Sequence, residues 1–468
     1  MKDLRLPLSW IADNLGSAER GAELEALGRK RVAGVSTDSR TVRPGEVFVA
    51  LKGEKFDGHC HAAGALARGA LAVVVQRALK GGAAGRALMV EDTLKALGDL
   101  ALALRRRQEL KVLALTGSNG KTGTKEMLAA ILRKIDAQLL ATAGNFNNLV
   151  GLPLTVFGLK KAGRLAVLEM GMNHFGEIAR LTEIAEPDVG LVTSIGPAHL
   201  EFFGSLSQVA KAKGELFAGL KDSALAVVDA DQPLLRRESK RFGGNKLFFG
   251  LGAPAQIRLG RVRPRGLTGQ DLTLYGPGAE KGRAVRLKLL GAHNAHNALA
   301  AAAAALAMGA DWDQIAGGLA EVESFPGRLS AVKTRRGLWL LDDSYNANPA
   351  SMSAGLKVLG DFGGRGARGA ILGDMGELGP AGGRFHREIG RLAAELNLDF
   401  LALVGPLSRH SARAARRAGL NRNAVAEFES PEEAAAWVLS GQPENAAVLV
   451  KGSHYMHMER AVDYLKNA

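Results

Sequence analysis

The residues with the clearest chemistry lie in the run Thr116-Gly117-Ser118-Asn119-Gly120-Lys121-Thr122. Glycines let backbone N–H groups close around phosphate oxygens, and a helix N-terminus adds partial positive charge. In such a loop Lys121 reaches the β- and γ-phosphates, and the Thr122 hydroxyl ligates Mg²⁺. Leu115 stands where the common pattern has its first glycine. The run predicts a triphosphate site, and the alternative is a tight turn that carries a lysine.

Three other polar positions suit chemistry on a phosphate. Glu169 follows a short apolar run, and a carboxylate there suits Mg²⁺; the alternative is an exposed glutamate at a strand end. His199, in residues 194–201, is a second candidate ligand, although a single histidine is more often packed or solvated. Lys213, in residues 210–215, lies in a stretch typical of a solvated helix face.

Three polar loops complete the candidate positions. Residues 142–153 carry three asparagines whose amides can bind phosphate or peptide groups, with an ordinary turn as the alternative. Residues 291–297 precede an alanine-rich helix, so a helix-capping turn is the alternative there. Residues 342–349 follow an apolar strand, which places them at the edge of a crevice, with a capped turn as the alternative.

The elements that must hold these residues alternate along the chain. Apolar runs predict strands at residues 47–51, 70–76, 112–115, 165–168, 189–193, 338–341, 370–372, 400–404 and 447–450. Residues 92–110, 125–132 and 297–308 have the pattern of helices, and period-two alternation predicts antiparallel strands at 271–275 and 285–289. The fold class is therefore α/β, with ligand sites at strand ends and between domains.

Composition narrows the class of protein. With 468 residues we expect about three domains. The net charge of +14 fits nucleic acid or small polyanions, but basic residues are scattered with no aromatic-interleaved stripe, so we expect no nucleic acid. We see no signal peptide, the run 298–308 is too short to span a bilayer, and Cys60 is the one cysteine. We expect a cytoplasmic protein without membrane insertion.

Five stretches together resemble a known family, the Mur ligases, which are ATP-dependent amide ligases that build the peptidoglycan stem peptide. The stretches are residues 116–122, 144–153, 169–171, 291–297 and 325–328. Residues 342–352, 372–379 and 450–459 resemble the branch that joins D-alanyl-D-alanine to UDP-N-acetylmuramoyl-tripeptide through an acyl phosphate. Residues 36–40 and 56–59 resemble that branch's UDP-sugar domain.

The resemblance implies three domains. Residues 1–90 would form a small α/β domain that binds the UDP-sugar peptide. Residues 91–325 would form the central parallel-sheet domain with the ATP loop. Residues 326–468 would form a Rossmann-like domain that binds D-alanyl-D-alanine and closes on ATP. Such a protein has small-molecule partners, and we expect it to act as a monomer.

The resemblance also implies roles for individual residues. The ATP contacts would be Gly117, Ser118, Asn119, Gly120, Lys121, Thr122, Gly123, Asn297, Arg328, Asp343, Tyr345 and Asn346. Two Mg²⁺ ions would be held by Thr122, Glu169, His199 and Lys213, the last as a carbamate formed with CO₂. The UDP-sugar peptide would contact Ser39, Arg40, Asn145, Asn147 and Asn148. The catalytic residues would be Lys121, His199, Lys213 and Lys451, with Lys451 approaching the reacting phosphate or carboxylate.

The chain departs from the family pattern at three places. Gly123 stands where the family has Ser or Thr, His454 stands where arginine is common, and Cys60-His61 replaces an Asp-aromatic pair. Three alternatives remain open: the ligase that adds the third residue, folylpolyglutamate synthase, and a nucleotide-binding protein without ligase activity. The Asp-Asn-Pro-Arg motif expected of a diaminopimelate-adding ligase is absent.

Overall fold

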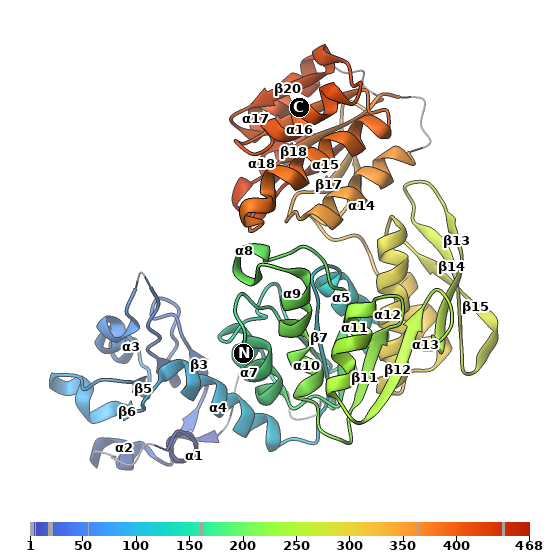
Figure 1. Cartoon of the computed structure of the whole chain (residues 1–468). Coiled ribbons are helices and arrows are strands. Elements are labelled where there is room, and N and C mark those ends of the chain that lie inside the picture. The colour runs from blue at the N-terminus through green and yellow to red at the C-terminus, as the bar shows by residue number, and fades with distance from the viewer. Residues whose placement is uncertain are drawn as a thin grey trace. The chain divides into compact units, whose positions relative to one another are not determined.

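The structure, a computed structural model, describes residues 4, 6–16, 22–54, 56–159, 163–362, 366–441 and 445–468. These residues form two compact units. The first contains residues 1–115, 136–190 and 218–224, and the second contains residues 116–135, 191–217 and 225–468. Figure 1 shows the helices and strands, coloured along the chain from the N-terminus to the C-terminus.

The first unit begins with a small α/β assembly. Its elements are β1 (Leu6–Pro7), α1 (Leu8–Asn14), α2 (Ala22–Leu27), β2 (Arg31–Val32), β3 (Gly34–Ser36), β4 (Glu46–Val49), η1 (Gly58–His61), α3 (Ala62–Ala67), β5 (Ala72–Val75), η2 (Gly81–Arg86) and β6 (Ala87–Met89). Strands β3, β4, β5 and β6 form a parallel sheet in that order. Phe48, Val73 and Val75 bury one face of it against α3, so this sheet has its own core.

The rest of the first unit carries part of a second parallel sheet. Its elements are α4 (Thr93–Arg106), β7 (Lys111–Thr116), β8 (Leu140–Ala141), α6 (Gly151–Val156), β9 (Leu165–Glu169) and α7 (Glu177–Ala185). Strand β9 pairs in parallel with β7 on one side and β8 on the other. Because the strands run parallel, the carboxyl ends of β7 and β9 meet at one sheet edge, where Glu169 ends β9.

The second unit begins at the last residue of β7. Its first elements are α5 (Lys121–Leu132), α8 (Leu200–Phe203), α9 (Leu206–Lys213), β11 (Leu225–Asp229), α11 (Pro233–Glu238), η3 (Ser239–Arg241), β12 (Asn245–Gly250), β13 (Ile257–Pro264), β14 (Gln270–Gly276), β15 (Ala279–Leu287), α12 (Ala292–Met308) and α13 (Trp312–Glu321). Strand β10 (Val189–Val192) and helix α10 (Glu215–Ala218) lie across the division between units.

Helix α12 is the central helix of this part. The alanines from Ala300 to Ala305 are at most 1% exposed, so the helix is buried on every side there. It packs against α5 and strands β11–β13. Small alanine side chains let the phosphate-loop helix α5 approach closely, and this contact fixes the start of α5 relative to α12.

The last part of the second unit is a six-stranded sheet with helices on both faces. Its elements are β16 (Ser330–Lys333), β17 (Trp339–Asp343), α14 (Pro349–Gly360), β18 (Arg368–Gly373), η4 (Gly379–Ala381), α15 (Gly382–Glu395), β19 (Phe400–Val404), α16 (Arg409–Arg417), η5 (Arg422–Ala424), β20 (Val425–Phe428), α17 (Pro431–Gly441), β21 (Ala447–Lys451), η6 (His454–Met456) and α18 (Glu459–Asn467). The strand order is β16-β17-β21-β18-β19-β20.

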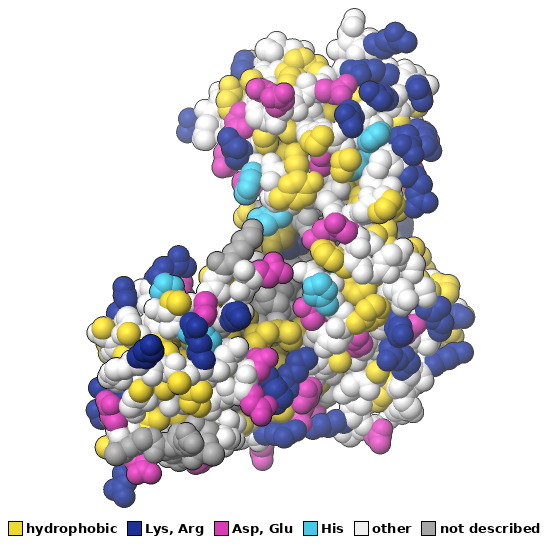
Figure 2. Space-filling model, turned by 60° about the vertical axis from the view of Figure 1, so that its left-hand side comes forward, with side chains coloured by type: hydrophobic (Ala, Val, Ile, Leu, Met, Phe, Trp, Pro, Cys, Tyr) yellow, Lys and Arg dark blue, Asp and Glu magenta, His cyan; other side chains and the backbone are white. Residues whose placement is uncertain are grey.

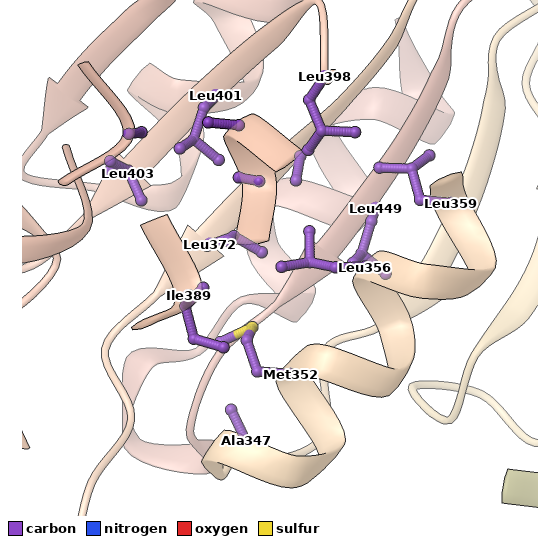
Figure 3. Close-up of a cluster of buried hydrophobic side chains, with 14 of the residues drawn as sticks. Ala347, Met352, Leu356, Leu359, Leu372, Ile389, Leu398, Leu401, Leu403 and Leu449 are labelled. Atoms are coloured by element: carbon purple, nitrogen blue, oxygen red, sulfur yellow. The ribbon is translucent and has the colours of Figure 1, made fainter. Parts of the chain in front are cut away.

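The strands of this sheet bury side chains on alternate faces. Leu372, Leu401 and Leu449 pack with α14 and α15 on one face, as Figure 3 shows. Their neighbours Ile371 and Val448 pack with α17 and α18 on the other face. This period of two with both faces apolar is the pattern of a doubly wound parallel sheet. The Rossmann-like expectation for this part is confirmed.

Most predicted elements are present, with shifted ends. Strands occur in each predicted region, and β13, β14 and β15 pair antiparallel as expected. Helix α5 begins at Lys121 and α12 at Ala292, both earlier than predicted, while α4 covers only part of residues 92–110. The ends of the three expected domains stay predictions.

Basic side chains do not gather into a single stripe on the visible surface. Figure 2 shows them over every part of the chain in view, with acidic side chains between many of them. Within the described residues, no helix has both the length and the apolar character needed to cross a bilayer.

We expect Leu449→Ala to destabilise the six-stranded sheet. Leu449 is fully buried at the centre of β21, and removing its isobutyl group leaves a cavity, which costs about 2–5 kcal/mol. The matched control is Val332→Ala on the edge strand β16, where the side chain is 36% exposed, and we expect a loss below about 1 kcal/mol. Urea unfolding followed by tryptophan fluorescence measures both, and equal losses would contradict this account of the core.

Candidate active site

The phosphate loop between β7 and α5 is held by the segment that follows β10. The Ser118 N–H donates to the Ser194 carbonyl at 2.8 Å, and the Asn119 N–H donates to Ser194 Oγ at 2.9 Å. Thr193 Oγ1 donates to the Asn119 carbonyl at 2.6 Å. The loop is therefore shaped before any ligand binds, which reduces the entropy lost on binding.

Two glycines of the loop are required by its geometry. Gly117 has φ of 154°, and a Cβ there would lie 2.0 Å from Thr193 Oγ1. Gly120 has φ of 80°, and a Cβ there would lie 2.2 Å from Asn297 Oδ1. At Gly123 the nearest atom is 3.7 Å away, on Asn297, so a larger residue fits. The departure at Gly123 therefore leaves the loop's shape unchanged.

Lys121 and Thr122 begin helix α5. Lys121 Nζ donates to the Gly117 carbonyl at 2.6 Å. The ammonium therefore lies across the loop in which it is expected to contact the ATP phosphates. The helix N-terminus adds its dipole at the same place. Both features add positive charge at the loop, which suits an anionic ligand.

Asn297 lies beside the loop, in the second turn of α12. Its side chain contacts Asn294, donating to Oδ1 at 3.2 Å. The alternative reading of residues 291–297 as a capping turn before the helix is wrong, because the helix starts at Ala292 and only Gly291 precedes it. Because α12 starts at Ala292, Asn297 lies in its second turn, and there its side chain limits the space at Gly120.

Lys213 is the last residue of α9 and is completely buried. Its Nζ has no hydrogen-bond partner among the described atoms. Burial, together with the nearby charge of Lys121, holds the pKa of Lys213 well below 10.5. The interpretation of residues 210–215 as a solvated face is wrong for Lys213, although Lys211 on the same helix is exposed.

His199 precedes helix α8 and contacts the loop after β18. Its Nδ1 lies 2.7 Å from Glu377 Oε2, and the Glu201 N–H donates to the Glu377 carbonyl at 3.0 Å. The contact with His199 lowers the pKa of Glu377, although burial opposes this effect. With Nδ1 facing a carboxylate, Nε2 is the nitrogen left to face a metal ion, an arrangement common in metal sites.

In the first unit, Glu169 and Asn147 form a second group. Glu169 is 2% exposed, so it is not the exposed strand-end glutamate of the alternative reading. Asn147 Nδ2 donates to Glu169 Oε1 at 2.9 Å, and the Asn147 carbonyl accepts from the Gly171 N–H at 2.7 Å. Asn148 Oδ1 accepts from the Gly151 N–H at 2.8 Å, as a turn asparagine does, while Asn145 is exposed.

Ser39 and Arg40 lie in the loop after β3 of the first unit. The Arg40 side chain is exposed and pairs with Asp38, with Nε to Oδ1 at 2.9 Å and Nη2 to Oδ2 at 2.8 Å. Hydrogen bonds from Arg40 hold the pKa of Asp38 at about 2. The guanidinium is thus preset in an accessible position.

The C-terminal loop at residues 343–348 carries the remaining expected nucleotide contacts. The guanidinium of Arg328 lies 4.3 Å from the centre of the Tyr345 ring. Asn348 Nδ2 donates to Asn119 Oδ1 at 2.7 Å, which brings this loop to the phosphate loop. Asp343 and Lys451 pair with each other at 2.7 Å. The alternative of a capped turn is also present, because Asn348 caps α14.

The expected metal-binding and nucleotide-binding residues are divided between the two units. The phosphate loop, Asn297 and Lys213 belong to the second unit with His199, and Glu169 belongs to the first. Among the described residues no three His, Cys, Asp or Glu side chains converge as a metal site. The Glu169 carboxylate in the first unit and the Thr122 hydroxyl in the second are each oxygen groups of the kind that Mg²⁺ takes as ligands.

Sequence reasoning missed Glu377 and Asn348 as individual site residues. Both lie inside stretches that carry the resemblance, residues 372–379 and 342–352. The sequence holds no signal for their partners, because His199 and Asn119 are far away along the chain.

Comparison with known proteins gives the same picture for the whole chain. Family models match residues 31–105 (Mur ligase family, catalytic domain), 115–305 (Mur ligase middle domain) and 327–454 (Mur ligase, glutamate ligase domain). The UDP-N-acetylmuramoyl-tripeptide–D-alanyl-D-alanine ligase of Escherichia coli K12 is 38% identical, over 99% of both chains.

Two solved structures are similar over almost their full length. Crystal structure I of MurF from Acinetobacter baumannii is 32% identical, covers 99% of both chains and has a TM-score of 0.89. MurF from Thermotoga maritima in complex with ADP is 30% identical, covers 93% of this chain and 97% of its own, and has a TM-score of 0.82.

We expect Gly120→Ala and Gly123→Ser to behave differently in ADP binding. The first forces a Cβ against Asn297 at a positive φ and should weaken binding by about tenfold or more, since each 1.4 kcal/mol is tenfold. The second has room and should change binding by less than about threefold. Isothermal titration calorimetry with Mg²⁺ and ADP measures both, and equal affinities would show that the loop geometry is not the constraint.

Proposed function

This chain belongs to the Mur ligase family, and we propose that it joins D-alanyl-D-alanine to UDP-N-acetylmuramoyl-tripeptide at the expense of ATP. The match to the Escherichia coli ligase of that name, over 99% of both chains, carries the proposal. The preset phosphate loop supports it, because the reaction begins with a nucleotide triphosphate. The product would be the pentapeptide precursor of peptidoglycan.

The reaction follows from the weak electrophilicity of a carboxylate. The terminal carboxylate of the tripeptide attacks the γ-phosphorus of ATP, so ADP leaves and an acyl phosphate forms. The amine of D-alanyl-D-alanine then attacks the acyl carbon, and the tetrahedral intermediate expels phosphate while the amine loses a proton. Water must stay away from the acyl phosphate, which otherwise hydrolyses.

Charge neutralisation is the task of the phosphate-loop residues. Lys121 and the N-terminus of α5 would attract the negative oxygens of the transferring group. Asn297, Arg328, Tyr345 and Asn346 would hold the nucleotide. Two Mg²⁺ ions bound by Thr122, Glu169, His199 and modified Lys213 would supply further positive charge to the phosphoryl group.

We also propose that Lys213 carries a carbamate. Burial lowers the pKa of Lys213 and so favours its neutral amine, the form that attacks CO₂. The nitrogen lone pair forms the N–C bond, one proton leaves the nitrogen, and the product is an anionic oxygen ligand. That conversion removes the buried unpaired ammonium and supplies the kind of oxygen that Mg²⁺ prefers.

The first unit would bind the UDP-sugar peptide. Arg40 is exposed and oriented by Asp38, as a phosphate-binding guanidinium should be. Ser39 lies next to it, and Asn145, Asn147 and Asn148 would contact the same substrate. Asn147 already touches Glu169, so this loop would link substrate binding to the metal-binding carboxylate.

The residues argue against the three alternatives. A protein that only binds nucleotide has no need for Glu169, His199 and a buried Lys213 together. A ligase adding the third residue, or folylpolyglutamate synthase, would not explain the stretches 342–352, 372–379 and 450–459. We place the reaction in the cytoplasm, where reducing conditions suit an exposed free thiol such as Cys60, and propose a monomer.

Phosphate release should require all three substrates. With ATP, a UDP-N-acetylmuramoyl-tripeptide and D-alanyl-D-alanine, we expect phosphate and a product heavier than the tripeptide by the dipeptide minus water. A coupled phosphate assay and mass spectrometry measure the two, with diaminopimelate- and lysine-containing tripeptides tested in parallel. Release with the dipeptide omitted, or with L-glutamate in its place, would refute the assignment.

Lys213→Ala should abolish both the carbamate and the activity. We expect kcat to fall by about a hundredfold or more, because a ligand near the transferring phosphoryl group is lost. The matched control is Lys211→Ala, on the same helix but exposed, which should keep normal activity. Carbon-13 NMR after incubation with labelled bicarbonate should show a carbamate signal in the wild type and the control alone. Full activity of Lys213→Ala would contradict the proposal.

A further inference from the structure

Lys451 is a buried lysine at the end of β21. Its side chain is 2% exposed, and its Nζ lies 2.7 Å from Asp343 Oδ2 and donates to the Asn346 carbonyl at 2.8 Å. Strands β17 and β21 are parallel neighbours in which Asp343 is in register with Lys451. Backbone pairing therefore brings the two charged side chains together, and the ammonium is compensated from within its own sheet.

The residues after Lys451 hold the same loop. Ser453 Oγ donates to the Ala347 carbonyl at 3.2 Å, and the His454 N–H donates to Asn346 Oδ1 at 3.4 Å. The His454 ring stacks on the Tyr345 ring, with centres 5.4 Å apart and planes at 28°. We call residues 451–454 the clamp segment and residues 343–348 the nucleotide loop. The clamp segment contacts the nucleotide loop at four of its six positions.

The clamp segment holds the nucleotide loop, and the nucleotide loop in turn contacts residues of the candidate nucleotide site. The Tyr345 ring contacts both the His454 ring and the guanidinium of Arg328. At the other end of the loop, Asn348 bonds to Asn119 of the phosphate loop. A shift of the loop would therefore move the Tyr345 ring and the Asn348 amide that bonds to the phosphate loop.

The ammonium has little freedom to act elsewhere. Two of its three protons are directed to Asp343 and Asn346, and it lies under the loop with almost no exposed surface. Burial raises the pKa of Asp343, while the charge of Lys451 opposes this rise. Without the ammonium, the carboxylate would be buried and unpaired, so it would take up a proton or draw in water and displace the loop.

We propose that Lys451 is a positioning residue that sets the nucleotide loop through Asp343 and Asn346 and does not touch the transferring phosphate. This role rests on the proposed ATP-dependent function, and it replaces the expectation that Lys451 approaches the reacting group. The clamp segment starts at the carboxyl end of β21, so contacts with the end of that strand fix the conformation of the nucleotide loop. Nucleotide affinity, more than the rate of phosphoryl transfer, depends on Lys451.

The test compares Lys451→Met, Asp343→Asn and the double variant. Lys451→Met should weaken ADP binding and raise KM for ATP by about tenfold or more, while kcat at saturating ATP falls by less than about threefold. The double variant should bind ADP more tightly than Lys451→Met, because no unpaired buried carboxylate remains. The control is Lys357→Met, an exposed lysine on α14, which should bind ADP normally.

Three results would overturn the proposal. One is a kcat reduced by about a hundredfold with ADP affinity unchanged, which marks an ammonium that acts on the transferring group. Another is a double variant that binds no better than Lys451→Met. The third is a wild-type chain that binds no ADP. If Lys451→Met does not fold in thermal unfolding, the double variant, with its neutral pair, is expected to fold, with a rise in KM for ATP of less than about tenfold and with kcat within about threefold of the wild type.

ADP binding separates this proposal from the proposed function. Calorimetry with Mg²⁺ and ADP needs neither the tripeptide nor the dipeptide. If phosphate release required different substrates, the proposed function would fail while the binding data still decided the role of Lys451.

Discussion

The cost of burying a lysine ammonium is the constraint on which this site depends. In the described part of the chain, Lys125, Lys213 and Lys451 are at most 2% exposed. An ammonium removed from water loses several kcal/mol of hydration free energy, and only a close carboxylate or several hydrogen bonds restore it. Lys125 pairs with Glu126 at 2.7 Å, and Lys451 pairs with Asp343. Lys213 Nζ has no such partner among the described atoms, so burial there disfavours the charged form of the amine.

Within each parallel sheet, the ends of the strands determine where the polar groups lie. Strand β7 ends at the phosphate loop, β9 ends at Glu169, and β17 and β21 end at the Asp343–Lys451 pair. Parallel strands end at the same edge, and the loops beyond that edge are free of the sheet's hydrogen bonding. The sheet can thus place charged groups accurately while the loops keep the backbone N–H groups that bind anions. The buried apolar faces of the same strands supply the stability that holds the charges in place.

Local patterns in the sequence were enough to find the strands, the phosphate loop and the pairing of the antiparallel strands. Those features depend on neighbouring residues, such as the alternation in residues 271–275 and the glycines of the loop. The contacts that complete the site join residues far apart: Asn119 and Asn348 are 229 positions apart, and Lys451 and Asn346 are 105 apart. No periodicity encodes such pairs. The burial of Lys213 also escaped prediction, because its neighbours Lys211 and Glu215 make the stretch look solvated until α9 packs.

The two departures from the family pattern in this region, at Gly123 and His454, leave the local packing of the loops intact. At Gly123 the space beside Asn297 remains open, so losing a hydroxyl there removes no contact that shapes the loop. At His454 the ring stacks on Tyr345, as a planar arginine would also do. What that position needs is therefore a flat group against the tyrosine ring. Arg328 on Tyr345 already supplies a permanent cation, and the buried charge of Lys451 lies beneath the same loop. The imidazole at position 454 keeps a planar ring stacked on Tyr345 without the permanent charge of an arginine.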